Sequence, residues 1–197
     1  MNPSLLQILP EIACLMNYEI DVACHCECEI DTQVIHDALV HGLQVEEVES
    51  AVLSISIVDN PTIHRLNREH LQHDYPTDVI SFQLEWTDET RTTPPTSPSQ
   101  RSSGASIEGE VIVSVDYAAE MAPHCGWSTE NELTLYAVHG MLHICGYDDL
   151  TPSEKEIMRA REQSVLSGLG LQPCYPDLNS LQTDQASHDA PPSEGLR

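Results

Sequence analysis

Segments with strand-like and helix-like periodicity alternate along the chain, and this alternation limits the folds that it can adopt. Four runs, at 18–30, 48–59, 77–85 and 108–116, carry the two-residue alternation or the β-branched residues that are typical of strands. Helical spacing of apolar residues follows at 32–43, 61–72 and 117–124 and in two longer segments after residue 128. Short strands interleaved with helices predict a single α+β or α/β domain, of which we favour α+β. The order of the strands in the sheet does not follow from the pattern.

The starts of the two longer helices carry capping patterns. Thr129 and Thr151 are each followed three residues later by a glutamate, and Pro152 stands at the first helical position of the second pattern. We therefore expect one helix from Thr129 to about residue 145 and another that ends at Gly168 or Gly170.

Composition divides the chain into a domain and its appendages. Residues 87–106 are mostly Thr, Ser, Pro and charged residues, which predicts a disordered surface insertion. The folded domain is expected at 18–170, with an N-terminal extension at 1–17 and a flexible acidic tail at 171–197. No run approaches the roughly 20 apolar residues of a membrane helix, so no membrane association is expected.

The net charge of the chain is extreme. Thirty-two acidic residues face eight basic ones, for a formal charge of −24. A surface of this sign repels phosphate backbones, so charge alone argues against a nucleic-acid partner.

The seven cysteines are odd in number and contain no C-x-x-C pair, which favours free thiols in a reducing cytoplasm. Cys24, Cys26 and Cys28 alternate, so they would share one face of a strand. Three thiols could bind a metal ion, but packing of small apolar side chains is the favoured interpretation.

The stretch HGMLHICGYDD, residues 139–149, has the spacing of a metal site. His139 and His143 lie one turn apart on the same helix face, so their imidazoles can converge on one ion. Gly146 can end the helix and turn a side chain from 147–149 toward that ion as a third ligand. The surrounding helix is apolar on nearly all sides, and buried histidines without partners are costly. The residue after His139 is Gly140 rather than a general-base glutamate, which disfavours a zinc peptidase.

This stretch resembles H-G-x-L-H-x-x-G-Y-D-H, the signature of the YbeY endoribonuclease family. LNREHLQHDYPTDVISF at 66–82 is similar to that family's L-N-x-x-x-R-x-x-D-x-P-T-D-V-L-S-F segment, and GEVIVSVDYA at 109–118 resembles its G-D-I-V-I-S stretch. The resemblance implies a mixed four-stranded sheet flanked by helices, with a metal site at the end of a central helix. It implies one Zn²⁺ ion held by His139, His143 and Asp149.

The same resemblance implies a function. It points to a zinc-dependent, single-strand-specific endoribonuclease that acts in maturation of the 3′ end of 16S ribosomal RNA and in ribosome biogenesis. Its partners would be single-stranded ribosomal RNA and the small ribosomal subunit or its proteins, in the cytoplasm.

Position 149 departs from the family signature, which ends in a third histidine. Aspartate also binds zinc, so a His-His-Asp site is possible. Asp148 matches the family's own aspartate and is expected to act as an outer partner of the ligands. It could also be the ligand in place of Asp149.

A second departure is Leu71, which stands where the family segment has an arginine. Leucine offers no donor to a phosphate. Arg68 lies three residues earlier on the same predicted helix face, and we expect it to take over this contact as a catalytic residue. The alternative is an ordinary exposed arginine. Lys155 and Arg159 also share a face of a helix that could flank the cleft, although a charge run of this kind is usually a solvated face.

Two other functions fit these departures. One is a weakly active or inactive, metal-stabilised ribosome-assembly factor whose acidic surface binds a basic ribosomal protein. The other is a metallohydrolase that acts on another substrate.

Overall fold

The computed structural model describes residues 17–88 and 100–175. Its strands are β1 (Asn17–Cys24), β2 (Ser50–Val58), β3 (Val79–Thr87) and β4 (Ser106–Ser114). Its helices are α1 (Thr32–Val45), α2 (Asn60–Leu66), η1 (Asn67–Leu71), α3 (Val115–Met121), η2 (Ala122–Cys125), α4 (Thr129–Ile144) and α5 (Pro152–Gly168). None of the described helices is long and apolar enough to cross a membrane.

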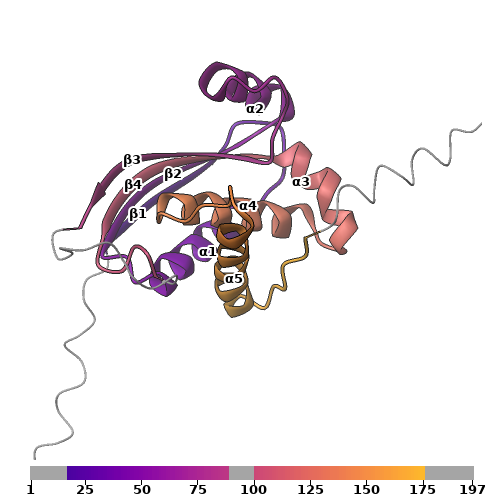
Figure 1. Ribbon diagram of the computed structural model, residues 1–197. Coiled ribbons are helices and arrows are strands. Elements are labelled where there is room, and N and C mark those ends of the chain that lie inside the picture. The colour runs from indigo at the N-terminus through magenta and orange to yellow at the C-terminus, as the bar shows by residue number, and fades with distance from the viewer. Residues whose placement is uncertain (1–16, 89–99, 176–197) are drawn as a thin grey trace, which may run out of the picture.

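The four strands form one mixed sheet in the order β1-β2-β4-β3. β1, β2 and β4 run parallel, and β3 pairs with β4 in the antiparallel direction at one edge. Helices α1, α4 and α5 lie below the sheet as drawn in Figure 1, and α2 lies beyond its other face. This confirms the expected α+β domain with a mixed four-stranded sheet.

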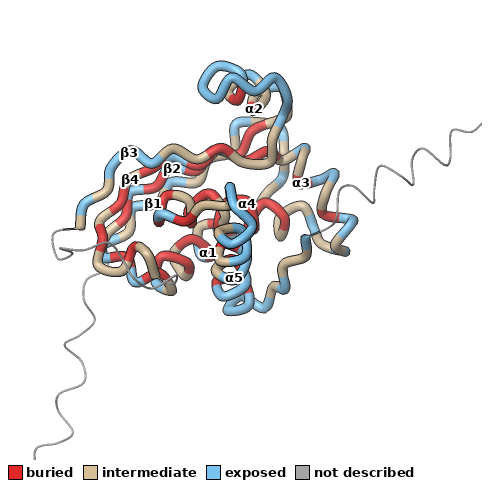
Figure 2. The backbone as a smooth tube through the Cα atoms, in the orientation of Figure 1, coloured by how far each residue is buried: buried red, intermediate tan, exposed pale blue. Residues whose placement is uncertain are grey.

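The buried face of the sheet explains why helices cover it. In β2, Leu53, Ile55 and Ile57 are buried, whereas Val52 and Ser54, on the alternate positions, are exposed. Residues of alternating burial point to opposite faces of a strand, so one face of β2 is apolar and needs a cover. The burial pattern is visible along the central strands in Figure 2.

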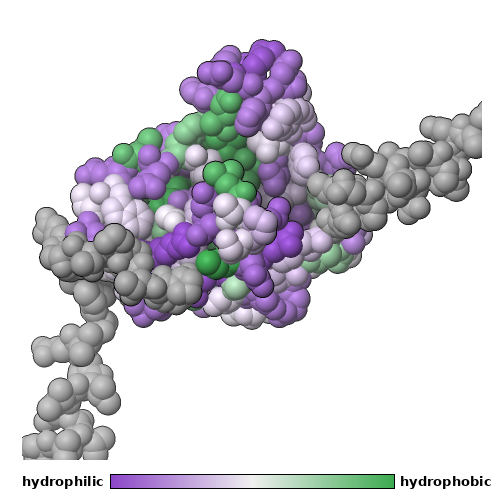
Figure 3. Space-filling view, in the orientation of Figure 1, coloured by the Kyte–Doolittle hydropathy of each residue, from purple (hydrophilic) through white to green (hydrophobic). Residues whose placement is uncertain are grey.

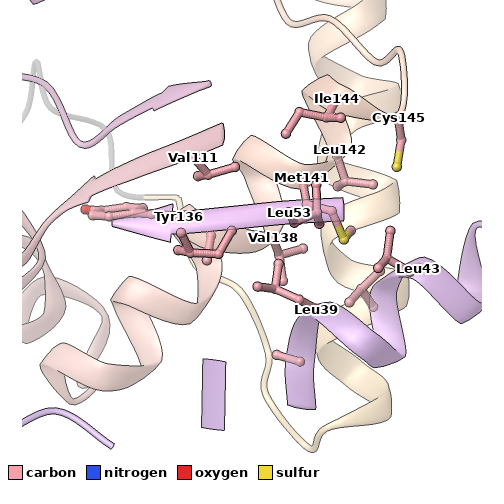
Figure 4. Packing of buried hydrophobic residues seen from close by; sticks show 14 of the residues in the cluster. Leu39, Leu43, Leu53, Val111, Tyr136, Val138, Met141, Leu142, Ile144 and Cys145 are labelled. Carbon is pink, nitrogen blue, oxygen red and sulfur yellow. The ribbon is translucent and has the colours of Figure 1, made fainter. Parts of the chain in front are cut away.

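Helix α4 is the central cover. Eleven of its sixteen residues are buried, so it is enclosed on nearly all sides. Figure 4 shows its Val138 and Met141 among Leu39 and Leu43 of α1 and Leu53 of β2. Full burial of such a side chain contributes about 1.5–3 kcal/mol, so this packing fixes the position of the helix.

Gly140 brings α4 close to the sheet. A Cβ at this position would lie 2.5 Å from Cγ1 of Val111 on β4 and 3.2 Å from Cγ2 of Val79 on β3. The position that would hold the glutamate of a zinc peptidase is therefore pressed against two strands, with no room for a side chain.

Two predicted boundaries were wrong, and one predicted helix changes its type along its length. The first strand ends at Cys24 rather than at residue 30, because Cys28 N–H donates to the carbonyl of Cys26 and the chain bends away from the ladder. Ser128, not Thr129, caps α4 and accepts the N–H of Asn131. The predicted helix at 61–72 ends as a wider π-type turn, η1, after which Gln72 adopts a φ of 62°.

The second capping pattern is confirmed, since Thr151 caps α5 and accepts the N–H of Glu154. Much of the predicted insertion, residues 89–99, lies outside the described residues, as do 1–16 and 176–197. At the start of the predicted insertion, β3 extends to Thr87. Near its end, Arg101 donates to the carbonyl of Gly146 at 3.0 Å and forms an ion pair with Glu154 at 2.7 Å.

Candidate metal centre

The two histidines of α4 turn one nitrogen each toward the other. Nε2 of His139 lies 3.0 Å from Nε2 of His143. Nδ1 of His139 lies 2.6 Å from a carboxylate oxygen of Glu162, and Nδ1 of His143 lies 3.0 Å from the carbonyl of Tyr147. Because both acceptors call for a proton on Nδ1, the Nε2 atoms of neutral imidazoles carry lone pairs. A cation between them would satisfy both, which is the usual arrangement around a metal-binding histidine.

The turn after α4 brings a carboxylate to the same place. Gly146, with a φ of 86°, ends the helix, and the N–H of Tyr147 then bonds back to the carbonyl of Leu142. Oδ1 of Asp149 lies 3.9 Å from Nε2 of His143. One ligand atom from each of His139, His143 and Asp149 lies within 4.8 Å of the other two. Two imidazole nitrogens and one carboxylate oxygen are a donor set that zinc accepts, and it leaves a fourth position open.

Asp148 has a different part in this turn. Its Oδ1 accepts the N–H of Asp149 at 2.7 Å and that of Leu150 at 3.2 Å. The carboxylate thereby holds the backbone of the turn, and among the described residues it is not part of the group that converges on the histidines. Of the two aspartates, the structure brings Asp149 to the site.

The two imidazoles differ in their readiness to be charged. Burial opposes protonation of His139, but the hydrogen bond and the charge of Glu162 outweigh it and raise the pKa of that histidine. Burial and the neighbouring His139 lower the pKa of His143. The surroundings of His139 thus favour a positive charge at this position, whereas those of His143 favour the neutral imidazole, which is the form that binds metals.

The centre opens into a cavity of about 640 Å³ between β3, α4 and α5. Its acidic lining residues are Asp78, Glu132, Asp149 and Glu162, and its basic ones are Lys155 and Arg159. Leu71, Val79 and Ile80 add apolar surface. In Figure 3, hydrophobic residues gather near the middle of the displayed face, with hydrophilic residues around them. Because acidic side chains outnumber Lys155 and Arg159 in this lining, a cation at the centre would have to offset part of the negative charge before a phosphate group could enter.

Sequence reasoning missed Glu162. This carboxylate is only 3% exposed and lies on α5, whose other buried residues are Met158, Val165 and Leu166. A single acidic residue on an otherwise apolar helix stripe was the available signal, because a buried charge needs a partner.

Sequence reasoning also missed the segment after α5. Tyr175 donates a hydrogen bond to Glu162, and its aromatic ring has the guanidinium of Arg159 4.4 Å from its centre. A disulfide between Cys125 and Cys174 ties this segment to η2. The expectation of free thiols therefore does not hold for this pair, because the fold brings two cysteines 49 residues apart into contact. Cys174 and Tyr175 both line the cavity.

The structure does not bring Arg68 to the cavity. Its side chain is 59% exposed, and a terminal nitrogen lies 3.9 Å from a carboxylate oxygen of Asp74. Leu71, where the family segment has its arginine, does line the cavity. Arg68 and Leu71 would share a face on an α-helix, but both lie in the wider π-type turn of η1, which changes their relative directions.

Comparison with known proteins finds relatives for most of the chain. The family described as "Endoribonuclease YbeY" matches residues 20–170, more than half of the chain. A protein named endoribonuclease YbeY from Salinibacter ruber is 39% identical over 145 residues, which cover 74% of this chain and 87% of that protein. Its namesake from Rhodopirellula baltica is 38% identical over 163 residues, covering 80% and 76% of the two chains.

A namesake from Lysinibacillus sphaericus is 37% identical over 141 residues, covering 71% of this chain and 87% of the other. A solution structure of a Thermotoga maritima protein aligns with 90% of this chain and 99% of its own, at 18% identity and a TM-score of 0.46, a likeness too distant to bear on the site.

Proposed function

This chain belongs to the YbeY endoribonuclease family, and from that premise we propose that it cleaves single-stranded ribosomal RNA beside His139, His143 and Asp149, with one Zn²⁺ as cofactor. The family acts in maturation of the 3′ end of 16S ribosomal RNA, and the small ribosomal subunit or its proteins would be the partners. We place this RNA-processing reaction in the cytoplasm. The observation that carries the proposal is the pair of Nε2 atoms 3.0 Å apart, with the carboxylate of Asp149 next to them.

A bound Zn²⁺ would supply Lewis-acid chemistry at the scissile phosphodiester. The protein's own part is to orient the ligands: Glu162 and the carbonyl of Tyr147 fix both imidazoles, and Asp148 holds the turn that carries Asp149. Rigid positioning of this kind lowers the reorganisation that catalysis requires.

The phosphate contact falls to Lys155 and Arg159 in this proposal. Both line the cavity from α5, one turn apart. Tyr175 holds the guanidinium of Arg159 against its ring at 4.4 Å, which restricts where this charge can lie. These two cations would offset part of the acidic lining when RNA enters.

The central test compares the purified protein with a His143→Ala variant. We expect His143→Ala to hold about one zinc ion fewer per chain than the wild type and to cleave single-stranded ribosomal RNA at least about 100-fold more slowly, since the ligand set of the histidine centre then has two members. His36→Ala, which alters a histidine of α1 away from the cavity, is the control and should cleave normally. Equal cleavage by wild type and His143→Ala would remove the enzyme proposal, and zinc-free wild type would remove the metal site.

Three further variants decide which cation meets the phosphate. Lys155→Ala and Arg159→Ala should each lower kcat/KM by about 10–100-fold, the usual worth of a hydrogen bond between charged groups. Arg68→Ala tests the role expected from the sequence. A loss in this variant alone would favour Arg68, whereas losses confined to the other two would favour the α5 pair.

A second candidate function rests on the charge of −24. An assembly factor that cleaves little could use its acidic surface to bind a basic ribosomal protein. Such a protein would carry zinc and bind the small subunit while His143→Ala leaves RNA processing unchanged. A metallohydrolase with another substrate would show zinc-dependent activity but no cleavage of RNA.

A further inference from the structure

Three cysteine thiols converge at the end of β1. Sγ of Cys24 lies 2.7 Å from Sγ of Cys28, and Sγ of Cys26 lies 3.5 Å from each of the other two. On a continuous strand, residues 24 and 28 would stand about 13 Å apart, given a rise of about 3.3 Å per residue. The local fold therefore gathers side chains that an extended chain would separate.

Backbone contacts hold this arrangement. β1 ends at Cys24, and the N–H of His25 still bonds to the carbonyl of Ile57 on β2. The N–H of Cys28 then donates to the carbonyl of Cys26, and the thiol of Cys24 lies 3.3 Å from the same carbonyl. The bend is thus anchored to the sheet on one side and closed by its own hydrogen bonds on the other.

The burial of these thiols differs from that of a core cysteine. Cys145 is fully buried in the core, whereas Cys24, Cys26 and Cys28 pack against the core while staying partly accessible. Their neighbours in sequence, His25, Glu27 and Glu29, are exposed. An ion from solvent can reach the thiols, and the nearby carboxylates favour a cation.

Metal binding to such a cluster displaces the protons of the thiols, so the ion is held by thiolates.

From this geometry we propose that Cys24, Cys26 and Cys28 form a second metal site, which binds one thiophilic ion of the Zn²⁺ or Cu⁺ class through three thiolates. A point about 2.3 Å from all three sulfurs, the usual zinc–sulfur distance, exists at these separations, and on binding the sulfurs of Cys24 and Cys28 would spread from 2.7 Å toward the wider spacing of a tetrahedral site. Thiolate ligands select soft ions over Mg²⁺ or Ca²⁺.

The thiolate site lies apart from the histidine centre. β1 is the edge strand opposite β3, and neither β1 nor residues 25–30 contribute to the cavity lining. An ion bound here would hold together the segment that connects β1 to α1, so we assign it a structural role. The site does not depend on the proposed ribonuclease activity.

The test is a titration of the full, reduced chain with Co²⁺ under anaerobic conditions. We expect sulfur-to-cobalt charge-transfer absorption that corresponds to one thiolate-bound ion per chain, saturates at one added ion per chain in the His143→Ala background, and disappears when excess Zn²⁺ is added. The Cys24→Ser/Cys26→Ser/Cys28→Ser variant should lose the absorption, while Cys14→Ser and His143→Ala keep it. No absorption in the wild type, or unchanged absorption in the triple variant, overturns the proposal. Charge-transfer absorption that persists in His143→Ala shows that the thiolate site is distinct from the histidine centre.

A measurement on the unmodified chain covers the case in which the triple variant does not fold. Zn²⁺ should slow alkylation of Cys24, Cys26 and Cys28 at least about tenfold, as read by peptide mass spectrometry, because a bound thiolate is a poor nucleophile. Equal alkylation with and without Zn²⁺ overturns the proposal. So does a Cys24–Cys28 disulfide that returns after reduction even with Zn²⁺ present.

Discussion

The two nitrogens of each imidazole in the histidine centre have separate tasks. Nδ1 of His139 is held by Glu162 and Nδ1 of His143 by the carbonyl of Tyr147, so each Nε2 faces the shared point. Glu162 is buried and also accepts a hydrogen bond from Tyr175. A charge in that position makes His139 a stronger ligand, since a carboxylate partner raises the basicity of the imidazole.

Glu162→Gln therefore should weaken zinc binding by about 10–100-fold while the chain stays folded, because the amide keeps the size of the carboxylate and loses its charge. Competition with a zinc chelator measures the affinity. Tyr175→Phe removes only the outer hydrogen bond and should change the affinity far less. Equal zinc affinities for wild type and Glu162→Gln would show that this carboxylate does not support the metal.

At the scale of secondary-structure elements, α4 ties the centre to the sheet. Its buried residues pack on α1, β3 and β4, and its last turn carries His143 and leads into Gly146. The close approach at Gly140 sets how near the helix lies to Val111 and Val79. The position of the ligands is therefore a consequence of helix-on-sheet packing as well as of the motif.

Gly140→Ala should lower the free energy of unfolding by about 1–3 kcal/mol, because the added methyl lies within 2.5 Å of Val111. The gain in helix propensity, about 1 kcal/mol, offsets part of the clash. Urea unfolding of chelator-treated protein measures the difference. Gln163→Ala, at an exposed position of α5, is the matched control and should stay within about 0.5 kcal/mol of wild type. A Gly140→Ala variant as stable as wild type would mean that α4 has room to move from the sheet.

For the whole molecule, the charge of −24 makes RNA an unusual partner. Long-range electrostatics oppose the approach of a polyanion, so binding has to rest on a few contacts at close range. The cavity offers two basic side chains, Lys155 and Arg159, and a centre where a cation fits.

The salt dependence of RNA binding follows from that count. Two phosphate contacts predict a slope of log affinity against log salt of about −1.4, at about 0.7 per contact for a single strand. Lys155→Ala should reduce the magnitude by about 0.7. Fluorescence anisotropy on a catalytically silent His143→Ala background measures both slopes. A slope of about −5 or steeper would reveal a basic surface outside the cavity.

The class of fold, the four strands and the pair His139 and His143 could be predicted from the sequence, because periodicity and spacing are local properties of the chain. The folded chain supplied what depends on long-range contacts. It brought Asp149 rather than Asp148 to the site, placed the buried Glu162 behind His139, and joined Cys125 to Cys174. It also left Arg68 outside the cavity and lined that cavity with Lys155 and Arg159. These partners are far apart in the chain or lie beyond a turn, and only the packing of α4 and α5 against the sheet and each other fixes their distances.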